Sequence, residues 1–285
     1  MYILMVVISA LFLGCYDVLR KISLKKSSVY EVLFFYCASA FLVSLLFIGK
    51  GINVDVLDVL FILLKSLIIV VNWALVLKCM KKIDVAIVVG FSLLNTLFVV
   101  FGSWIFFNEN LTWAHFVSLI FMGIGIILIT RIENKDKEQK ISNDYKYLWF
   151  LFFSSMLGAS SGLLDKYILN YRQVSNNSVL TLFMLFTSVI YGCIYFYKNK
   201  KIEFKNLKNN LWIVATGASI AFADIFYYYS ITMEDAQLSL ISILRKTSVL
   251  VATILASVFL REKYLFKKLG VLIFMLIGVG VAVFF

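Results

Sequence analysis

Residues 109–125 read E-N-L-T-W-A-H-F-V-S-L-I-F-M-G-I-G, and residues 262–278 read E-K-Y-L-F-K-K-L-G-V-L-I-F-M-L-I-G. In both passages one glutamate, Glu109 or Glu262, lies ten residues before the sequence Leu-Ile-Phe-Met-x-Ile-Gly. Each passage lies at the end of one half of the chain. The repetition indicates a protein that is built from two similar hydrophobic units.

The composition indicates the environment in which these two units fold. Apolar residues make up 62% of the chain, against roughly 45–50% in soluble domains. The mean hydropathy is +0.95, and charged residues account for only 15%. A soluble protein of this length would need more polar surface, so we predict an integral membrane protein.

Windows that can cross a bilayer as a helix need about 20 mostly apolar residues. The sequence contains ten of them, at about residues 3–22, 31–49, 57–78, 84–107, 113–130, 147–168, 179–197, 210–231, 236–260 and 267–285. These windows are continuous and do not alternate between polar and apolar residues, which excludes a transmembrane β-barrel. The predicted fold class is therefore an all-α membrane protein with ten transmembrane helices.

The loops between these spans differ in charge. Odd-numbered loops contain 21 lysines and arginines, and even-numbered loops contain 3. Because cytoplasmic loops are enriched in positive charge, we expect the odd loops in the cytoplasm and both termini outside, in a multi-pass protein of the cell membrane. The net charge of +11 is explained by these loops, so we expect no nucleic acid partner.

The two halves have opposite orientations in this scheme. A unit of five spans has an odd number of crossings, so its second copy must enter the membrane upside down. The loop charges agree, because the loop of Glu109 has no lysine or arginine and the loop of Glu262 has four. We divide the chain into a first repeat at 1–132, a charged linker at 133–146 and a second repeat at 147–285.

This pattern resembles the drug/metabolite transporter superfamily in its ten-span form with two EamA-type repeats. The residues that support the resemblance are W-I-F-F-N-E-N-L-T-W at 104–113 and V-F-L-R-E-K-Y-L-F at 258–266, each followed by a helix with glycines. The resemblance implies two inverted five-helix repeats and transport of a small molecule. Members commonly have a proline in the fourth and ninth spans, and this chain has none. They also commonly keep both termini in the cytoplasm, whereas the loop charges here predict the reverse.

Charged residues inside the bilayer are the candidates for function, because each is costly to place there. At about 100° per residue, Arg245 and Lys246 share the polar face of the ninth span, and Leu240 and Leu244 lie on a face that we expect to contact lipid. The eighth span contains one carboxylate, Asp224. Two cations beside one carboxylate leave a surplus charge that an anionic substrate would neutralise. The alternatives are an ion pair that only joins the two spans, and a cation that extends to the membrane surface. The predicted substrate-binding residues are Asp224, Arg245, Lys246, Tyr227, Tyr228, Ser242 and Asn72.

The first half offers mainly neutral groups. Lys65 and Asn72 share a face of the third span because they lie seven residues apart. We expect Asn72 to line a cavity and Lys65 to extend to the membrane surface. The fourth span adds only neutral side chains, Ser92, Asn95 and Thr96. The predicted site is therefore asymmetric, with its charges from the second repeat.

Charged residues near the ends of spans favour a structural interpretation. We expect local ion pairs of Asp17 with Arg20 and Lys21, and of Asp165 with Lys166. The two repeated glutamates are expected to stabilise the turns that follow the fourth and ninth spans. Neither glutamate is predicted to carry protons.

The leading hypothesis is a secondary transporter of a small polar metabolite such as an amino acid, with export as the expected direction and alternating access between two inverted repeats. The absence of a Walker motif excludes direct use of ATP. A single histidine, His115, argues against a histidine-based metal site, and we expect no cofactor. Two alternatives stay open. One is efflux of several drugs or organic cations, and the other is a membrane enzyme or accessory subunit for lipid-linked substrates, for which no catalytic constellation is found.

The expected partners are the lipid bilayer and the small-molecule substrate. The sequence leaves two further properties open: whether a coupling ion such as a proton takes part, and whether the protein is a monomer or a homodimer.

Overall fold

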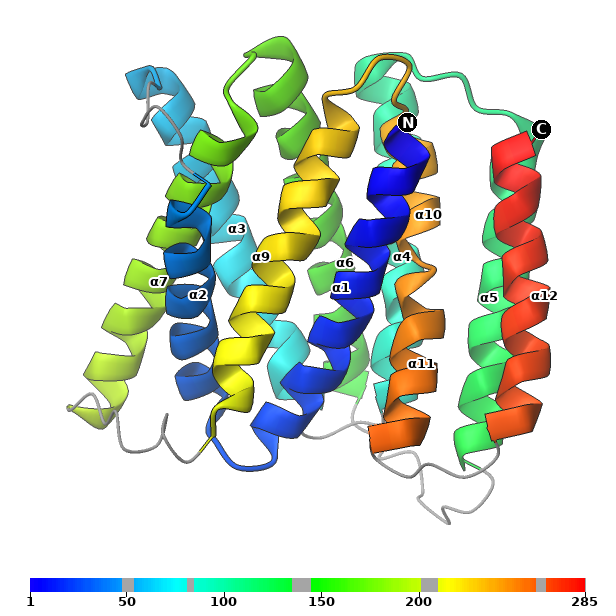
Figure 1. The fold of residues 1–285 in the computed structure, drawn as a ribbon, viewed down its shortest axis with the longest axis horizontal. Coiled ribbons are helices and arrows are strands. Elements are labelled where there is room, and N and C mark those ends of the chain that lie inside the picture. Colours follow the sequence, from blue (N-terminus) through cyan, green and yellow to red (C-terminus); the bar gives the residue numbers. More distant parts are fainter. Residues whose placement is uncertain (48–53, 81–84, 135–144, 201–209, 260–264, 285) are drawn as a thin grey trace.

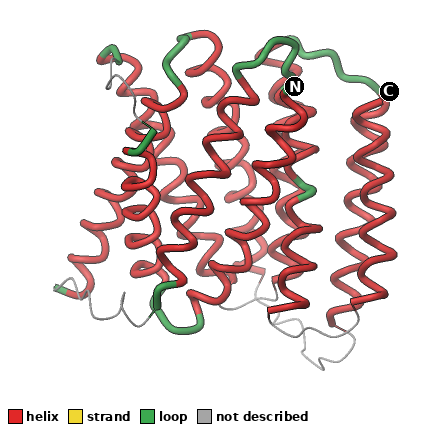
Figure 2. The backbone as a smooth tube through the Cα atoms, viewed as in Figure 1, coloured by secondary structure: helices red, strands yellow, loops and turns green. Residues whose placement is uncertain are grey.

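The computed structural model describes residues 1–47, 54–80, 85–134, 145–200, 210–259 and 265–284. Within these residues the chain forms helices and no β-strand (Figure 2). The elements are α1 Tyr2–Leu24, α2 Val29–Leu45, α3 Val56–Met80, α4 Val85–Phe107, α5 Trp113–Asn134, α6 Tyr145–Lys166, η1 Tyr167–Tyr171, α7 Asn176–Asn199, α9 Trp212–Ile231, α10 Leu238–Arg245, α11 Ser248–Phe259 and α12 Leu265–Phe284.

These elements confirm the predicted all-α membrane fold. The sixth predicted span corresponds to α6 continued by the π-helix η1, and the ninth corresponds to α10 and α11 in succession. Each of the other eight predicted spans corresponds to a single helix. By length and composition alone, five helical segments of the described residues are long and apolar enough to cross a membrane.

The two repeats are inverted relative to each other. Both termini lie at one end of the bundle, α1 runs away from that end, and α6 runs towards it (Figure 1). Helix packing follows the same symmetry. Helix α1 packs on α9 as its counterpart α6 packs on α3, and α11 packs on α1 as α4 packs on α6. The borders of the repeats stay a prediction, and residues 135–144 of the predicted linker lie outside the described part of the chain.

The repeated passages form an interface with each other. Helices α5 and α12 stand side by side (Figure 1), and the equivalent rings of Phe121 and Phe274 stack with centroids 4.6 Å apart. The last glycine of each motif lies where the other helix comes close, since a Cβ on Gly278 would lie 2.4 Å from the Cβ of Phe121. The motif therefore encodes contact between the repeats.

A second close approach lies between α2 and α9, and it gives a testable prediction. A Cβ on Gly217 would lie 2.4 Å from the backbone carbonyl oxygen of Tyr36, and backbone in a packed helix cannot move away freely. We expect Gly217→Ala to destabilise the protein by about 1–3 kcal/mol, measured as a lower melting temperature in detergent. Gly270→Ala is the matched control, because no atom lies within 4 Å of its added Cβ. Equal melting temperatures for the two variants would contradict the prediction.

The ninth predicted span is broken in the middle of the bundle, where Figure 2 shows a short loop. Helix α10 ends at Arg245, and the backbone N–H groups of Lys246 and Thr247 donate to carbonyls only three residues back, at 3.0 Å. The expected lipid contact of Leu240 and Leu244 is wrong. Both are buried, because α10 lies inside the bundle and packs on α1 and α4.

Candidate functional site

A cavity of about 320 Å³ lies between the repeats and is lined from α1, α3, α4, α6, α7, α9, α10 and α11. The seven residues predicted from the sequence all line it: Asp224, Arg245, Lys246, Tyr227, Tyr228, Ser242 and Asn72. The structure thus brings them together around one space. That they bind a substrate stays a prediction.

The cavity extends towards one end of the bundle. Its lining includes Met80, the last residue of α3, and Arg20, which lies in the last turns of α1. Both helices end opposite the chain termini (Figure 1). In the other direction the lining stops at Lys65, Asp165 and Tyr228, below the end of the bundle where the termini lie.

The second repeat provides one charged wall of the cavity. The guanidinium of Arg245 donates to Oδ1 of Asp224 at 3.2 Å and lies 4.0 Å above the ring centre of Tyr227. The ion pair considered at the sequence level is therefore present, and it lines the cavity. The next residue, Lys246, has no hydrogen-bond or ion-pair partner among the residues that the structure describes. It interacts with Asp17 only from beyond ion-pair distance.

A second ion pair lies where the cavity closes. Nζ of Lys65 is 2.5 Å from Oδ1 of Asp165, and it also donates to the hydroxyl of Tyr228. It lies 4.0 Å from the ring centre of Phe183. The expectation that Lys65 extends to the membrane surface is wrong, because this carboxylate and these rings hold it inside. The expected local pair of Asp165 with Lys166 is also wrong.

The charges around the cavity do not cancel. Asp17 and Arg20 form the local pair that the sequence predicts, at 2.8 Å. Among the described lining residues, three carboxylates stand against four cations, so the formal charge is +1. The three ion pairs are neutral, and the surplus belongs to Lys246.

The opposite wall carries neutral polar groups. Ser154 donates from its hydroxyl to Oδ1 of Asn72 at 2.6 Å, which orients the amide. Asn95 donates from Nδ2 to the backbone carbonyl of Ser155 at 3.4 Å. The hydroxyl of Thr96 is buried and has no hydrogen-bond partner in the part of the chain that the structure describes. This wall offers amide and hydroxyl groups to a polar ligand.

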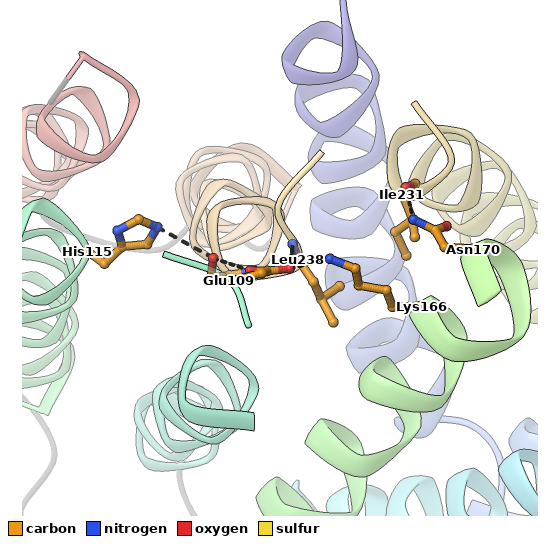
Figure 3. Close-up of polar contacts among 7 residues, drawn as sticks. Glu109, His115, Lys166, Asn170, Ile231 and Leu238 are labelled. Atoms are coloured by element: carbon orange, nitrogen blue, oxygen red, sulfur yellow. Dashed lines mark hydrogen bonds and ion pairs between the residues drawn. The ribbon is translucent and has the colours of Figure 1, made fainter. Parts of the chain in front are cut away.

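A separate cluster at the closed end centres on Glu109 (Figure 3). Its Oε1 accepts hydrogen bonds from the backbone N–H of Leu238 at 2.6 Å and from Nζ of Lys166 at 2.5 Å. Its Oε2 accepts from the backbone N–H and the hydroxyl of Ser239, at 2.9 and 2.5 Å. Glu109 therefore joins the two repeats. The sequence alone indicates only a local role in the turn after the fourth span. The equivalent residue, Glu262, lies outside the described residues.

Local sequence explains how Glu109 reaches α10. Helix α4 is followed by Asn108 in the left-handed conformation, with φ of 52°, which asparagine tolerates better than most residues. The N–H of Glu109 then donates to the carbonyl of Ser103, six residues back, at 3.4 Å, so the chain folds back over the end of α4. Helix α10 begins after Gln237, whose side chain makes no cap. Glu109 supplies that cap from the other repeat.

The neighbours of Glu109 also set its charge. Burial raises the pKa of this carboxyl, but hydrogen bonds from Lys166 and Ser239 outweigh burial and lower the pKa below its usual value. Glu109 is therefore ionised at neutral pH. His115 lies beside it, with Nδ1 held by the backbone N–H of Thr112 at 3.3 Å and Nε2 lying 3.5 Å from the hydroxyl of Ser239. Across the described ranges, no group of three or more His, Cys, Asp or Glu side chains is arranged to hold a metal ion.

Comparison with known proteins supports the interpretation of the fold. The sequence profile of the EamA-like transporter family matches residues 1–131 and 145–284. Among solved structures 29 chains match, and one of them, titled only "Crystal structure of protein", superposes with a TM-score of 0.78. That match covers 97% of this chain and 94% of the other at 16% identity, so it concerns the fold alone. No curated protein matches the sequence.

Proposed function

The chain belongs to the EamA-like transporter family, and on this premise we propose that it carries a small polar metabolite with an anionic group, such as an amino acid, through the cavity described above. It works as a secondary transporter, by alternating access between the two inverted repeats. The substrate occupies the space between the charged wall and the opposite wall, which carries the neutral amide and hydroxyl groups. The protein acts in the cell membrane.

The observation that supports this proposal is the surplus charge of the cavity. Lys246 lines it without a hydrogen-bond or ion-pair partner among the described residues. A cation in a protein interior of low dielectric is costly unless an anion or water accompanies it. An anionic substrate supplies that counter-charge. The hydroxyl of Thr96 and Nε of Arg245, which form no hydrogen bond within the described ranges, add hydrogen-bonding groups for the polar part of the substrate.

The same geometry disfavours organic cations as substrates. Among the aromatic rings that line the cavity, those of Tyr227, Tyr228 and Phe183 already lie against the protein's own cations: Arg245 lies over Tyr227, and Lys65 lies over Phe183 and Tyr228. Each carboxylate that could serve as a counter-ion is already paired: Asp224 with Arg245, Asp165 with Lys65 and Asp17 with Arg20. A second cation would enter a cavity that is already positive.

For the proposed export, loop charges and the cavity together suggest the side from which the substrate enters. The cavity extends towards the end of the bundle opposite the chain termini, and the loop charges of the sequence assign that end to the cytoplasm by the positive-inside rule. The conformation is then one that accepts substrate from the cytoplasm. In this arrangement the other end of the bundle faces the outside and is closed.

A ligand screen tests the proposal. We expect amino acids or sugar phosphates, and not organic amines, to raise the melting temperature of the purified protein. A ligand at a hundred times its dissociation constant stabilises the folded state by about 2.7 kcal/mol. The stabilisation should disappear in Lys246→Met. Stabilisation by organic amines alone would reject the proposal and favour drug efflux, and equal stabilisation of Lys246→Met by the anionic ligands would reject this site.

A further inference from the structure

We propose that Glu109, Lys166 and the first turn of α10 form a latch that closes the cavity at the end where the chain termini lie, and that must open for the substrate to leave there. The inference rests on the proposed alternating access. It assigns the closed gate to named residues outside the substrate site.

The first support is the position of three ion pairs that join the repeats. Lys166 pairs with Glu109, Lys65 with Asp165, and Arg172 of the loop after η1 with Asp58 of α3 at 2.6 Å. Each pair has one partner in the first repeat and one in the second. All three lie on the side of the cavity towards the chain termini, so they connect the elements that must separate when this end opens.

The second support is the way Glu109 binds α10. The carboxylate accepts four hydrogen bonds, and three of them come from the first turn of α10. The first N–H groups of a helix need partners from outside the helix, and α10 receives none from Gln237. The start of α10 in the second repeat is thus held by the first repeat (Figure 3).

The third support is the shortness of α10. It has only eight residues, so the whole helix is about 12 Å long at 1.5 Å per residue. Its last residue is Arg245, followed by Lys246 at the break before α11. A shift of the capped end therefore moves both cations of the substrate site, which links the latch to the cavity.

The latch can open because water can replace its bonds. Glu109 lies in the loop between α4 and α5, and Lys166 is the last residue of α6. Both residues are buried in this conformation, but they lie near the terminal end of the bundle, where the separated charges can be hydrated once it opens. The Lys65–Asp165 pair lies deeper and lines the cavity itself.

Thiol labelling tests the latch without knowledge of the substrate. The reporter is Ser161→Cys, a buried position that lines the cavity one turn before Asp165 on α6. A membrane-impermeant maleimide is added to right-side-out and to inside-out vesicles, and labelling at residue 161 is read by peptide mass spectrometry. An epitope tag at the N-terminus identifies the side on which the termini lie.

We expect Glu109→Gln and Lys166→Met each to speed labelling from the terminal side at least tenfold, with little change from the other side. The matched control is Glu31→Gln. Glu31 is also a buried capping carboxylate, but it caps its own helix α2 through Ser28. An unchanged rate from the terminal side, or an equal rise in Glu31→Gln, would overturn the latch.

A milder variant keeps the proposal testable if Glu109→Gln and Lys166→Met fail to fold. Ser239→Ala removes one hydrogen bond to Oε2 of Glu109 and keeps the ion pair with Lys166. It should still speed labelling from the terminal side, and no change would reject the proposal. Because labelling needs no ligand, such a result would leave the substrate class to be decided by the melting-temperature screen.

Discussion

Lys246→Met is expected to slow transport of the anionic metabolite into proteoliposomes by about tenfold to a hundredfold, while the protein stays folded. Lys246 is the cavity cation without a hydrogen-bond or ion-pair partner among the described residues, so its removal breaks no hydrogen bond or ion pair of that part of the chain. A hydrogen bond to a charged group contributes about 1.5–3 kcal/mol, and each 1.4 kcal/mol corresponds to about a factor of ten. Methionine keeps most of the side-chain volume and removes the charge.

Two variants make this experiment specific. Lys246→Arg keeps the positive charge and should retain more transport than Lys246→Met. Lys26→Met removes the same charge from an exposed position in the loop between α1 and α2, and should transport like the native protein. Normal transport by Lys246→Met, or equal losses in Lys246→Met and Lys26→Met, would show that the surplus charge does not recognise the substrate.

The intramembrane charges were the part of the site that the sequence could indicate. Charge is so costly in a bilayer that a single rule points to Asp224, Arg245 and Lys246, and all three line the cavity. The same rule fails for Lys65. A lysine in one helix is consistent with extension to the surface until a partner is known, and its partner Asp165 lies in the other repeat. No local pattern connects the two.

The break between α10 and α11 was missed for a related reason. The sequence has neither proline nor glycine at this point, and helical periodicity continues across it. The one local signal is Thr247, whose hydroxyl donates to the carbonyl of Leu244 at 2.8 Å. Such bonds compete with the helical backbone pattern. Threonine is nevertheless common in transmembrane helices, so this signal alone predicts no break.

Glu109 shows how far a repeated motif can be interpreted. Its repetition with Glu262 indicates a constrained position, and the turn after α4 agrees with that. The partner of Glu109 is the backbone of α10, more than a hundred residues away along the chain. Backbone N–H groups have no sequence signature, so only the fold identifies this contact.

Asp165→Asn is expected to cause a large loss of stability, of about 3–5 kcal/mol. The substitution leaves the ammonium of Lys65 buried, with 2% of its side chain exposed, and without its carboxylate. The rings of Phe183 and Tyr228 that flank the ammonium compensate only in part, since a cation–π contact contributes about 0.5–2 kcal/mol. The measurement is the free energy of unfolding in detergent, from a denaturant titration.

A double variant separates the pair from the individual residues. Asp165→Asn combined with Lys65→Met removes both charges, so it should recover much of the stability that Asp165→Asn loses. Asp17→Asn is the matched control. Its carboxylate is 30% exposed, so we expect a cost of about 1 kcal/mol or less. Similar losses in Asp165→Asn and in the double variant would contradict the buried pair as the cause. Because the pair is neutral, its joint removal leaves the cavity charge at +1, and the folded double variant should keep the native preference for anionic ligands.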